Sequence, residues 1–234
     1  RTKTPHILAI LPAVIPTATI YILRPLQAMA ERGEIHFTFI TEEKSTLRQI
    51  HSCDLIVFCR NDNSDFLGNL QEALRWGIPT VYDIDDNFWE LPENLWIGKY
   101  YRAGRRLETI ETYLRNVTLV RAFSKRLQER VSALYNHSVE LTTPCIDLSL
   151  MPTEPAPRRD QAIHLVYATS KTYADPLCQL FLPALQNLLA AYPEQLQAHF
   201  YGGVPSELLR YPNARWQPVD YEYASYLANL GAAG

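Results

Sequence analysis

Short apolar runs and amphipathic segments follow one another along the first 142 residues of the chain. Residues 54–59 read DLIVFC, an apolar run that is typical of a strand buried on both faces of a parallel sheet. Residues 35–40 alternate as IHFTFI, which indicates a strand with one face less buried. Segments with an apolar stripe of helical period lie between such runs. This order predicts an α/β fold with a doubly wound parallel sheet.

The predicted elements of this first part can be placed by number. Strands are predicted over residues 6–11, 35–40, 54–59, the start of 80–92, 117–123 and 139–142. Helices are predicted over residues 20–32, 45–51, 64–76, 96–115 and 125–135. Gly33 and Gly77 are predicted to end two of these helices, and Ser45 and Ser124 to cap two others.

Residues 143–161 change the pattern, since they hold four prolines and no clear period. We interpret them as a linker between a first domain, 1–142, and a second domain, 162–234. The second part predicts strands over 163–168, 197–201 and 214–219 and helices over 175–191 and 221–230. The apolar face predicted for the first of these helices consists of Leu177, Leu180, Leu185, Leu188 and Leu189. Three strands are few for a Rossmann-like domain, so we expect the second domain to be cut short.

The composition restricts the class of protein but does not indicate a function. The 234 residues are 47% hydrophobic and 20% charged, and a net charge of −3 gives no reason to expect nucleic acid as a partner. The cysteines at 53, 59, 145 and 178 form no C-x-x-C pair, which favours buried reduced thiols over a zinc site. Residues 7–23 are apolar but short and carry two prolines, so they indicate a strand, a loop and a helix start rather than a membrane span. Because the chain begins at Arg1 without a methionine, targeting stays open at this end.

Three carboxylates follow the strand that begins the stretch 80–92. Asp83, Asp85 and Asp86 lie within four residues, and like charges this close need water or partners. Ligands of open α/β sheets bind beyond the carboxyl ends of the strands, so this stretch is a candidate site. An acidic turn with an aspartate capping the next helix is the simpler alternative. A divalent metal held on a diphosphate by the D-x-D triplet is a further one.

Five phrases of the sequence together resemble one family. They are YILRPLQAM at 21–29, TVYDIDDNFWELP at 80–92, VTLVRAFSKRLQERV at 117–131, TTPCIDLSLMP at 142–152 and IHLVYATSKTYAD at 163–175. The chain resembles the GT-B glycosyltransferases of the large retaining group often called glycosyltransferase family 1 or family 4, in a bacterial type with a YDIDD segment. The resemblance implies two Rossmann-like domains, the first binding the acceptor and the second a nucleotide sugar. It also implies that no metal and no cofactor is required.

Some features depart from the family pattern. The loop PAVIPTAT lacks the double glycine that many GT-B enzymes place there, and Cys145 stands where an asparagine is usual. The family's donor-gripping glutamates would follow Gly234, so we expect an incomplete donor site and an inactive isolated chain.

The resemblance assigns roles to particular residues. Asp85 and Asp86 would be catalytic or orient the acceptor, and Asp83 and Arg24 would bind it. The donor would be bound by Ser170, Lys171, Asp175, Gly202 and Gly203. Carboxylates suit sugar hydroxyls, and backbone N–H groups at a strand–helix loop suit a diphosphate. A surface arginine and a capped turn are the plain alternatives for Arg24 and for the donor loop.

A basic and aromatic segment adds a possible surface partner. Lys99, Arg102, Arg105 and Arg106 lie beside Trp96, Tyr100 and Tyr101, a composition that suits an anionic membrane surface as well as a solvated helix face. The overall prediction is a cytoplasmic sugar transferase, at the inner face of the membrane, that acts on a glycan or lipid-linked acceptor in cell-surface polysaccharide or glycoconjugate synthesis.

Two rival functions remain open at this point. The same scaffold can serve a non-catalytic sugar- or partner-binding protein. A magnesium-dependent phosphohydrolase would use the acidic cluster, but it would need a nucleophilic aspartate after the first strand, where Leu11 and Pro12 stand.

Overall fold

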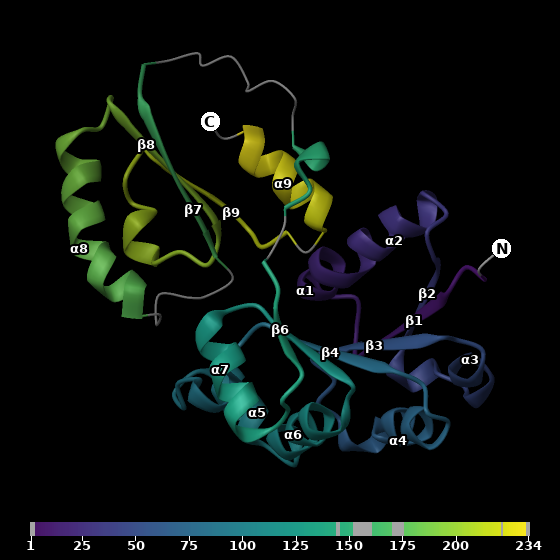
Figure 1. The fold of residues 1–234 in the computed structure, drawn as a ribbon. Helices are drawn as coiled ribbons and strands as arrows, with labels where there is room; N and C mark the ends of the chain where they lie inside the picture. The colour runs from purple at the N-terminus through teal and green to yellow at the C-terminus, as the bar shows by residue number, and fades with distance from the viewer. Residues whose placement is uncertain (1–2, 144–145, 152–160, 170–175, 221, 233–234) are drawn as a thin grey trace. The chain divides into compact units, whose positions relative to one another are not determined.

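A computed structural model describes the chain apart from residues 1–2, 144–145, 152–160, 170–175, 221 and 233–234 (Figure 1). The described chain divides into two compact units, Arg1–Ile146 and Asp147–Gly234. The division falls inside residues 143–161, which we interpret from the sequence as a linker. We refer to these parts as unit 1 and unit 2 and describe each by itself.

Unit 1 is built on one six-stranded parallel sheet in the order β2-β1-β3-β4-β5-β6. Its strands are β1 (His6–Leu11), β2 (His36–Thr41), β3 (Leu55–Cys59), β4 (Thr80–Ile84), β5 (Leu119–Ala122) and β6 (Val139–Leu141). Its helices are α1 (Pro16–Ala18), α2 (Arg24–Glu31), α3 (Leu47–His51), α4 (Gly68–Arg75), α5 (Trp96–Arg102), α6 (Arg106–Asn116) and α7 (Lys125–Leu134). A π-helical turn, Thr19–Leu23, joins α1 to α2.

Both faces of this sheet are buried, which explains the continuous apolar runs in its central strands. On β1, Leu8 and Ile10 face a core that includes residues of α3, α4, α6 and α7, whereas Ile7, Ala9 and Leu11 face a second core with the α1–α2 segment. Neighbouring residues of one strand point to opposite faces, so one run of six residues supplies both cores. Cys53 and Cys59 are buried free thiols in these cores, as predicted.

The structure corrects two helix predictions in unit 1. The single helix predicted over 96–115 is two helices, because Ala103 is extended (φ −75°, ψ 142°) and Gly104 takes a left-handed φ of 60°. The N-cap of α3 is Thr46 rather than Ser45, and Thr46 forms a capping box with Gln49. The Ser45 hydroxyl instead donates to the Asn69 side chain at 2.6 Å. Ser124 caps α7 as predicted, accepting from the Leu127 amide at 3.3 Å.

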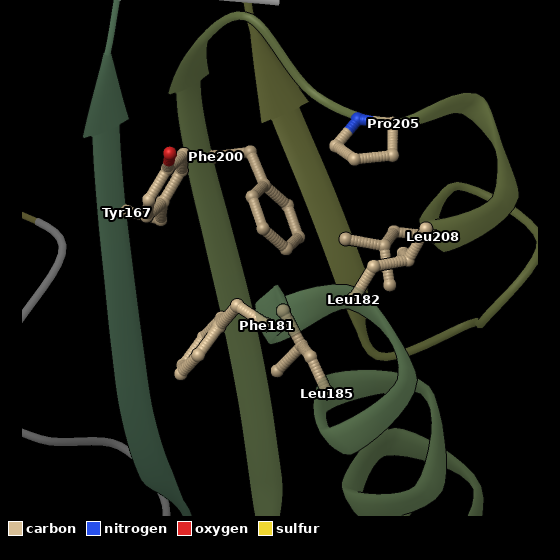
Figure 2. A pocket seen from close by; sticks show the side chains of 7 residues that line it. All are labelled: Tyr167, Phe181, Leu182, Leu185, Phe200, Pro205 and Leu208. Carbon is tan, nitrogen blue, oxygen red and sulfur yellow. The ribbon is translucent and has the colours of Figure 1, made fainter. Parts of the chain in front are cut away.

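Unit 2 holds a three-stranded parallel sheet in the order β7-β8-β9. The strands are β7 (Ile163–Thr169), β8 (Leu196–Gly202) and β9 (Ala214–Gln217), and the helices are α8 (Pro176–Ala191) and α9 (Tyr223–Ala232). Figure 2 shows how α8 meets the sheet: Leu182 and Leu185 point toward Phe200 of β8, with Pro205 and Leu208 beside them. The lining of this small gap is apolar, so it belongs to the hydrophobic core of unit 2.

The apolar face predicted for α8 is only partly right. Leu185 and Leu189 are 2% and 1% exposed, whereas Leu180 is 80% exposed and Leu188 41%. The core side also includes Leu182, which the prediction omitted. Because α8 carries no charged residue in its 16 positions, its sequence gives little contrast between the inner and outer faces.

This correction predicts unequal effects of two matched leucine substitutions. Leu185→Ala should lower the free energy of unfolding of unit 2 by roughly 2–5 kcal/mol, because it leaves a cavity against Phe200. Leu180→Ala should change it by less than about 0.5 kcal/mol, because the side chain already lies in water. Hydrogen exchange of the β8 amides measures both, and equal losses of protection would contradict the assignment of the two faces.

Candidate functional site

Charged side chains gather at the carboxyl edge of the sheet of unit 1. Thr17 follows β1, Arg60 follows β3, and Asp85 and Asp86 follow β4. Strands β1 and β3 are hydrogen-bonded neighbours, and the chain continues from β1 to one side and from β3 to the other. Such a reversal of strand order is where open α/β sheets bind their ligands.

The Arg60 guanidinium binds both predicted catalytic aspartates. Its Nε and Nη2 donate to the two carboxylate oxygens of Asp85, each at 2.6 Å, and Nη2 also donates to Asp86 at 2.6 Å. The Thr17 hydroxyl donates to Asp85 at 3.3 Å. The Asp85 side chain is 13% exposed and the Asp86 side chain 54% exposed. Asp85 is therefore held in place, and Asp86 is the carboxylate that presents more surface to solvent.

Arg60 has an unusual backbone conformation. Its φ is 56°, a left-handed value that is costly for a residue with a side chain. The guanidinium lies 5.4 Å from the centre of the Phe88 ring. Burial opposes its charge, but the hydrogen bonds and charge of Asp85, together with the charge of Asp86, raise the pKa of Arg60 above its ordinary value. The ion pairs thus stabilise a strained turn.

A second ion pair lies beneath this one. Asp83 is 1% exposed and pairs with Arg121, directly opposite it on β5, through both guanidinium Nε (2.7 Å) and Nη2. Arg121 also donates to the Tyr21 carbonyl at 3.2 Å, which ties the π-helical turn to the sheet. Burial raises the pKa of the Asp83 carboxyl, and Arg121 opposes that rise. The predicted role of Asp83 in acceptor binding stays a prediction, and the described hydrogen bonds of its side chain are with Arg121.

A third ion pair lies beside the first. Asp62, which is 5% exposed, accepts from Arg106 Nη1 at 2.8 Å, and the Arg106 guanidinium lies 4.0 Å above the centre of the Tyr100 ring. Burial raises the pKa of the Asp62 carboxyl, against the opposing effect of Arg106. Tyr101 is buried, and its pKa is raised by burial and by the charges of both Asp62 and Asp85. Ring contacts connect the Arg60 and Arg106 ion pairs, because the Tyr101 ring lies 4.2 Å from the Phe88 ring and 5.1 Å from the Tyr100 ring.

The other predicted site residues divide between the units. Arg24 begins α2 and is partly buried. In unit 2, Gly202 has a φ of 91°, and a Cβ at this position would collide with the Thr169 carbonyl, to which the Gly203 amide donates at 2.8 Å. A side chain at 202 would therefore disturb the end of β7. Ser170, Lys171 and Asp175 lie outside the described residues.

The predicted basic surface is largely engaged with unit 1 itself. Arg102 donates to the Gly98 and Trp89 carbonyls, Arg105 to Glu108, and Arg106 to Asp62. Lys99 is exposed on α5. Within the described residues, no group of three histidine, cysteine, aspartate or glutamate side chains is placed to hold a metal ion. Nor is any described helix both long and apolar enough to cross a bilayer.

The sequence analysis missed four of the site residues named above, which are Thr17, Arg60, Asp62 and Arg121. Arg121 carries a usable signal, because an arginine inside an apolar strand needs a buried partner and the acidic strand is adjacent. The sequence signal for Arg60 is weaker. Arg60 follows the end of a strand, but its left-handed backbone cannot be recognised from the sequence because the residue is not a glycine.

Comparison with known proteins supports the fold. No family model matches the chain, and no curated protein matches it. Among solved structures, a co-structure of S. aureus MnaA with UDP is similar, at 10% identity over 96% of this chain and 71% of that chain, with a TM-score of 0.55. The predicted fold class, α/β with a Rossmann-like parallel sheet in each unit as in GT-B proteins, is confirmed.

Two further similar structures have lower scores. The glycotransferase of kitacinnamycin matches at 11% identity over 92% of this chain and 71% of that chain, with a TM-score of 0.43. TarM matches at 8% identity over 75% of this chain and 34% of that chain, also with a TM-score of 0.43.

The buried pair predicts a test of what Asp83 does. Asp83→Ala should lower the free energy of unfolding by roughly 3–5 kcal/mol, because it leaves the Arg121 charge without its carboxylate. The double variant Asp83→Leu, Arg121→Met should recover most of that loss, since both charges are gone. Urea unfolding measures the effect, and a mild loss in Asp83→Ala would argue that the carboxylate is kept for a ligand instead.

Proposed function

We propose that the chain is a glycosyltransferase that moves a sugar from a nucleotide-sugar donor to a hydroxyl of a glycan or lipid-linked acceptor, with retention of the anomeric configuration. Unit 1 binds the acceptor and unit 2 binds the donor. The proposal is supported by the two parallel-sheet units, by the phrases that resemble retaining GT-B enzymes, and by the fold shared with a protein that binds UDP.

The observation that carries the proposal is the set of hydrogen bonds from the Arg60 guanidinium to Asp85 and Asp86, which we call the Arg60 fork. It holds Asp85 rigidly and leaves Asp86 more than half exposed at the edge of the sheet where ligands bind. A carboxylate in that position can accept hydrogen bonds from sugar hydroxyls and orient one of them for transfer. In this scheme Asp85 and Asp86 orient the acceptor, and Arg24 contacts it.

The donor side of the scheme uses residues that follow β7 in the sequence. Ser170, Lys171 and Asp175, with Gly202 and Gly203, would hold the diphosphate, on which negative charge grows as the glycosidic bond breaks. The close approach of Gly202 to Thr169 keeps the ends of β7 and β8 free of a side chain at that point. No metal and no cofactor takes part in the proposed reaction.

The fork also bears on the phosphohydrolase alternative. A magnesium site needs carboxylate oxygens that are available to the ion. Both oxygens of Asp85 accept hydrogen bonds from Arg60, and a cation placed there would be repelled by the guanidinium. The geometry therefore favours a site for hydroxyl groups over a site for a metal.

The proposal includes a cytoplasmic location at the inner face of a membrane. On α5, Trp96 is 73% exposed and Tyr100 37% exposed, with Lys99 between them in sequence. Aromatic rings and a lysine on one helix can rest in an anionic lipid surface. Binding to vesicles with and without anionic lipid, compared for the protein and Trp96→Ala, tests this part separately.

The function is tested on the full-length protein with a panel of nucleoside diphosphates and nucleotide sugars, first by thermal shift and then by product analysis with glycan acceptors. We expect one nucleotide sugar to raise the melting temperature and its sugar to appear on an acceptor with the same anomeric configuration. A nucleotide sugar that binds and is never transferred by the full-length protein would contradict the proposal and leave a binding protein.

Matched variants then test the fork. Asp86→Asn should lower kcat/KM for the acceptor about tenfold or more, because the amide replaces a charged acceptor of hydrogen bonds. Arg60→Lys should have a similar effect, since lysine cannot form the two parallel hydrogen bonds to Asp85. Glu129→Gln, on the exposed surface of α7, is the control and should leave kcat/KM unchanged. Full activity of Arg60→Lys would remove the fork from the mechanism.

A further inference from the structure

A pocket in unit 1 lies next to the Arg60 fork but is separate from it. It is lined by residues 62–65, which follow β3, and by residues 103–106, the turn between α5 and α6. Its volume is about 250 Å³, close to the lower end of pockets that hold small ligands, roughly 300 Å³. We call it the Asp62–Arg106 pocket, after the ion pair in its wall.

The walls of this pocket are fixed by contacts of their own. Asp62 is buried and bound to Arg106, whose guanidinium stacks on the Tyr100 ring. The Asn63 side chain accepts from the Asp65 amide at 3.0 Å, which holds the first loop in shape. The opposite wall turns at Gly104, where φ is 60°. A pocket with walls held in this way is formed before a ligand arrives, so binding costs little ordering.

The charges around the pocket are balanced, which limits the ligand class. Arg106 is paired with Asp62, and Arg105 donates to Glu108 at 2.8 Å. No surplus of positive charge is left among the described lining residues to favour a phosphate. A cation is disfavoured as well, because the carboxylates of Asp62 and Asp65 are balanced by the two arginines of the lining, and Asp62 already accepts from one of them.

The polar groups that remain suit a neutral ligand rich in hydroxyls. Asn63 has an amide, Ser64 a hydroxyl and Asp65 a carboxylate, and each arginine carries five N–H donors of which the ion pair uses a part. These groups include both donors and acceptors, and a sugar hydroxyl can pair with either. Among the described residues of the lining, Ala103 carries the only apolar side chain, so an apolar ligand would gain little.

We propose that the Asp62–Arg106 pocket binds one neutral sugar ring of a glycan, at a site separate from the carboxylates of the Arg60 fork. The identification of that glycan with the acceptor rests on the proposed function, whereas the binding of the ring does not. Both sites lie where the chain leaves β3 and are linked by the ring contacts of Tyr101 with Phe88 and Tyr100, so the pocket would select acceptors by a sugar next to the one that reacts.

The test is an NMR titration of the isotope-labelled chain with neutral monosaccharides, each at up to about 50 mM, because a single ring is expected to bind with a Kd in the millimolar range. We expect amide shifts at residues 62–65 and 103–106. Inorganic phosphate at the same concentration is the anionic probe and should produce smaller shifts there. Absence of shifts with every neutral sugar, or tighter binding of phosphate, would overturn the proposal.

Two variants locate the binding. Ser64→Trp fills the pocket and should abolish the sugar-induced shifts, and Asp65→Asn, a smaller change that keeps the shape of the loop, should weaken binding at least about threefold. Glu129→Gln is the matched control for the lost carboxylate and should bind as the parent does. Sugar shifts that persist unchanged in both pocket variants would place the ligand elsewhere and refute the assignment.

The outcome is distinguishable from a failure of the proposed function. The titration needs neither a donor nor turnover. Sugar binding in the pocket without any transfer would therefore support the pocket assignment and contradict the proposed transferase activity. If Ser64→Trp transfers sugar to every acceptor tested as fast as the parent protein does, the transferase activity is supported. The pocket is then not an acceptor subsite.

Discussion

The fork of Arg60 on Asp85 and Asp86 is the interaction on which the edge of unit 1 depends. It joins the end of β3 to the end of β4 and holds a non-glycine residue in a left-handed conformation. Such a conformation costs on the order of 1–3 kcal/mol and persists only where its surroundings fix it. Here the surroundings are two carboxylates, the Phe88 ring and, one layer below, the Asp83–Arg121 pair. Strand order brings these groups together: Arg60 follows β3, the aspartates and Phe88 belong to or follow β4, and Arg121 lies on β5, the other neighbour of β4.

Much of the fold could be predicted from the sequence because both faces of the unit 1 sheet are buried. A strand such as β3 then has an apolar run that no helix of the same length would need, and glycines such as Gly33 and Gly77 mark the ends of the helices between strands. The predictions that failed concern segments where the pattern carries less information. A helix with no charge, α8, does not reveal which leucines point outward. The break between α5 and α6 depends on two residues only, one extended and one left-handed.

The candidate site was predicted in part, and the missing part is its positive charge. Three aspartates in four residues are visible in the sequence, but their arginine partners lie 25 and 38 positions away along the chain. Register decides such pairs: Asp83 stands opposite Arg121 because β4 and β5 align there, and no local pattern fixes that alignment. The same limit applies to Asp62 and Arg106, which are 44 positions apart.

The three ion pairs between arginines and aspartates change which ligands this acidic strand end can bind. Unpaired carboxylates at this density would either collect a cation or take up protons as their pKa values rise. All four aspartates accept from an arginine, which satisfies their charge inside the protein, and Asp86, the most exposed of the four, also meets the solvent. The edge is then polar and rigid with little net charge, which suits neutral hydroxyls, whose recognition depends on the direction of hydrogen bonds more than on attraction at a distance. Such an edge selects ligands by the directions of its hydrogen bonds, and the strained turn at Arg60 helps to fix those directions.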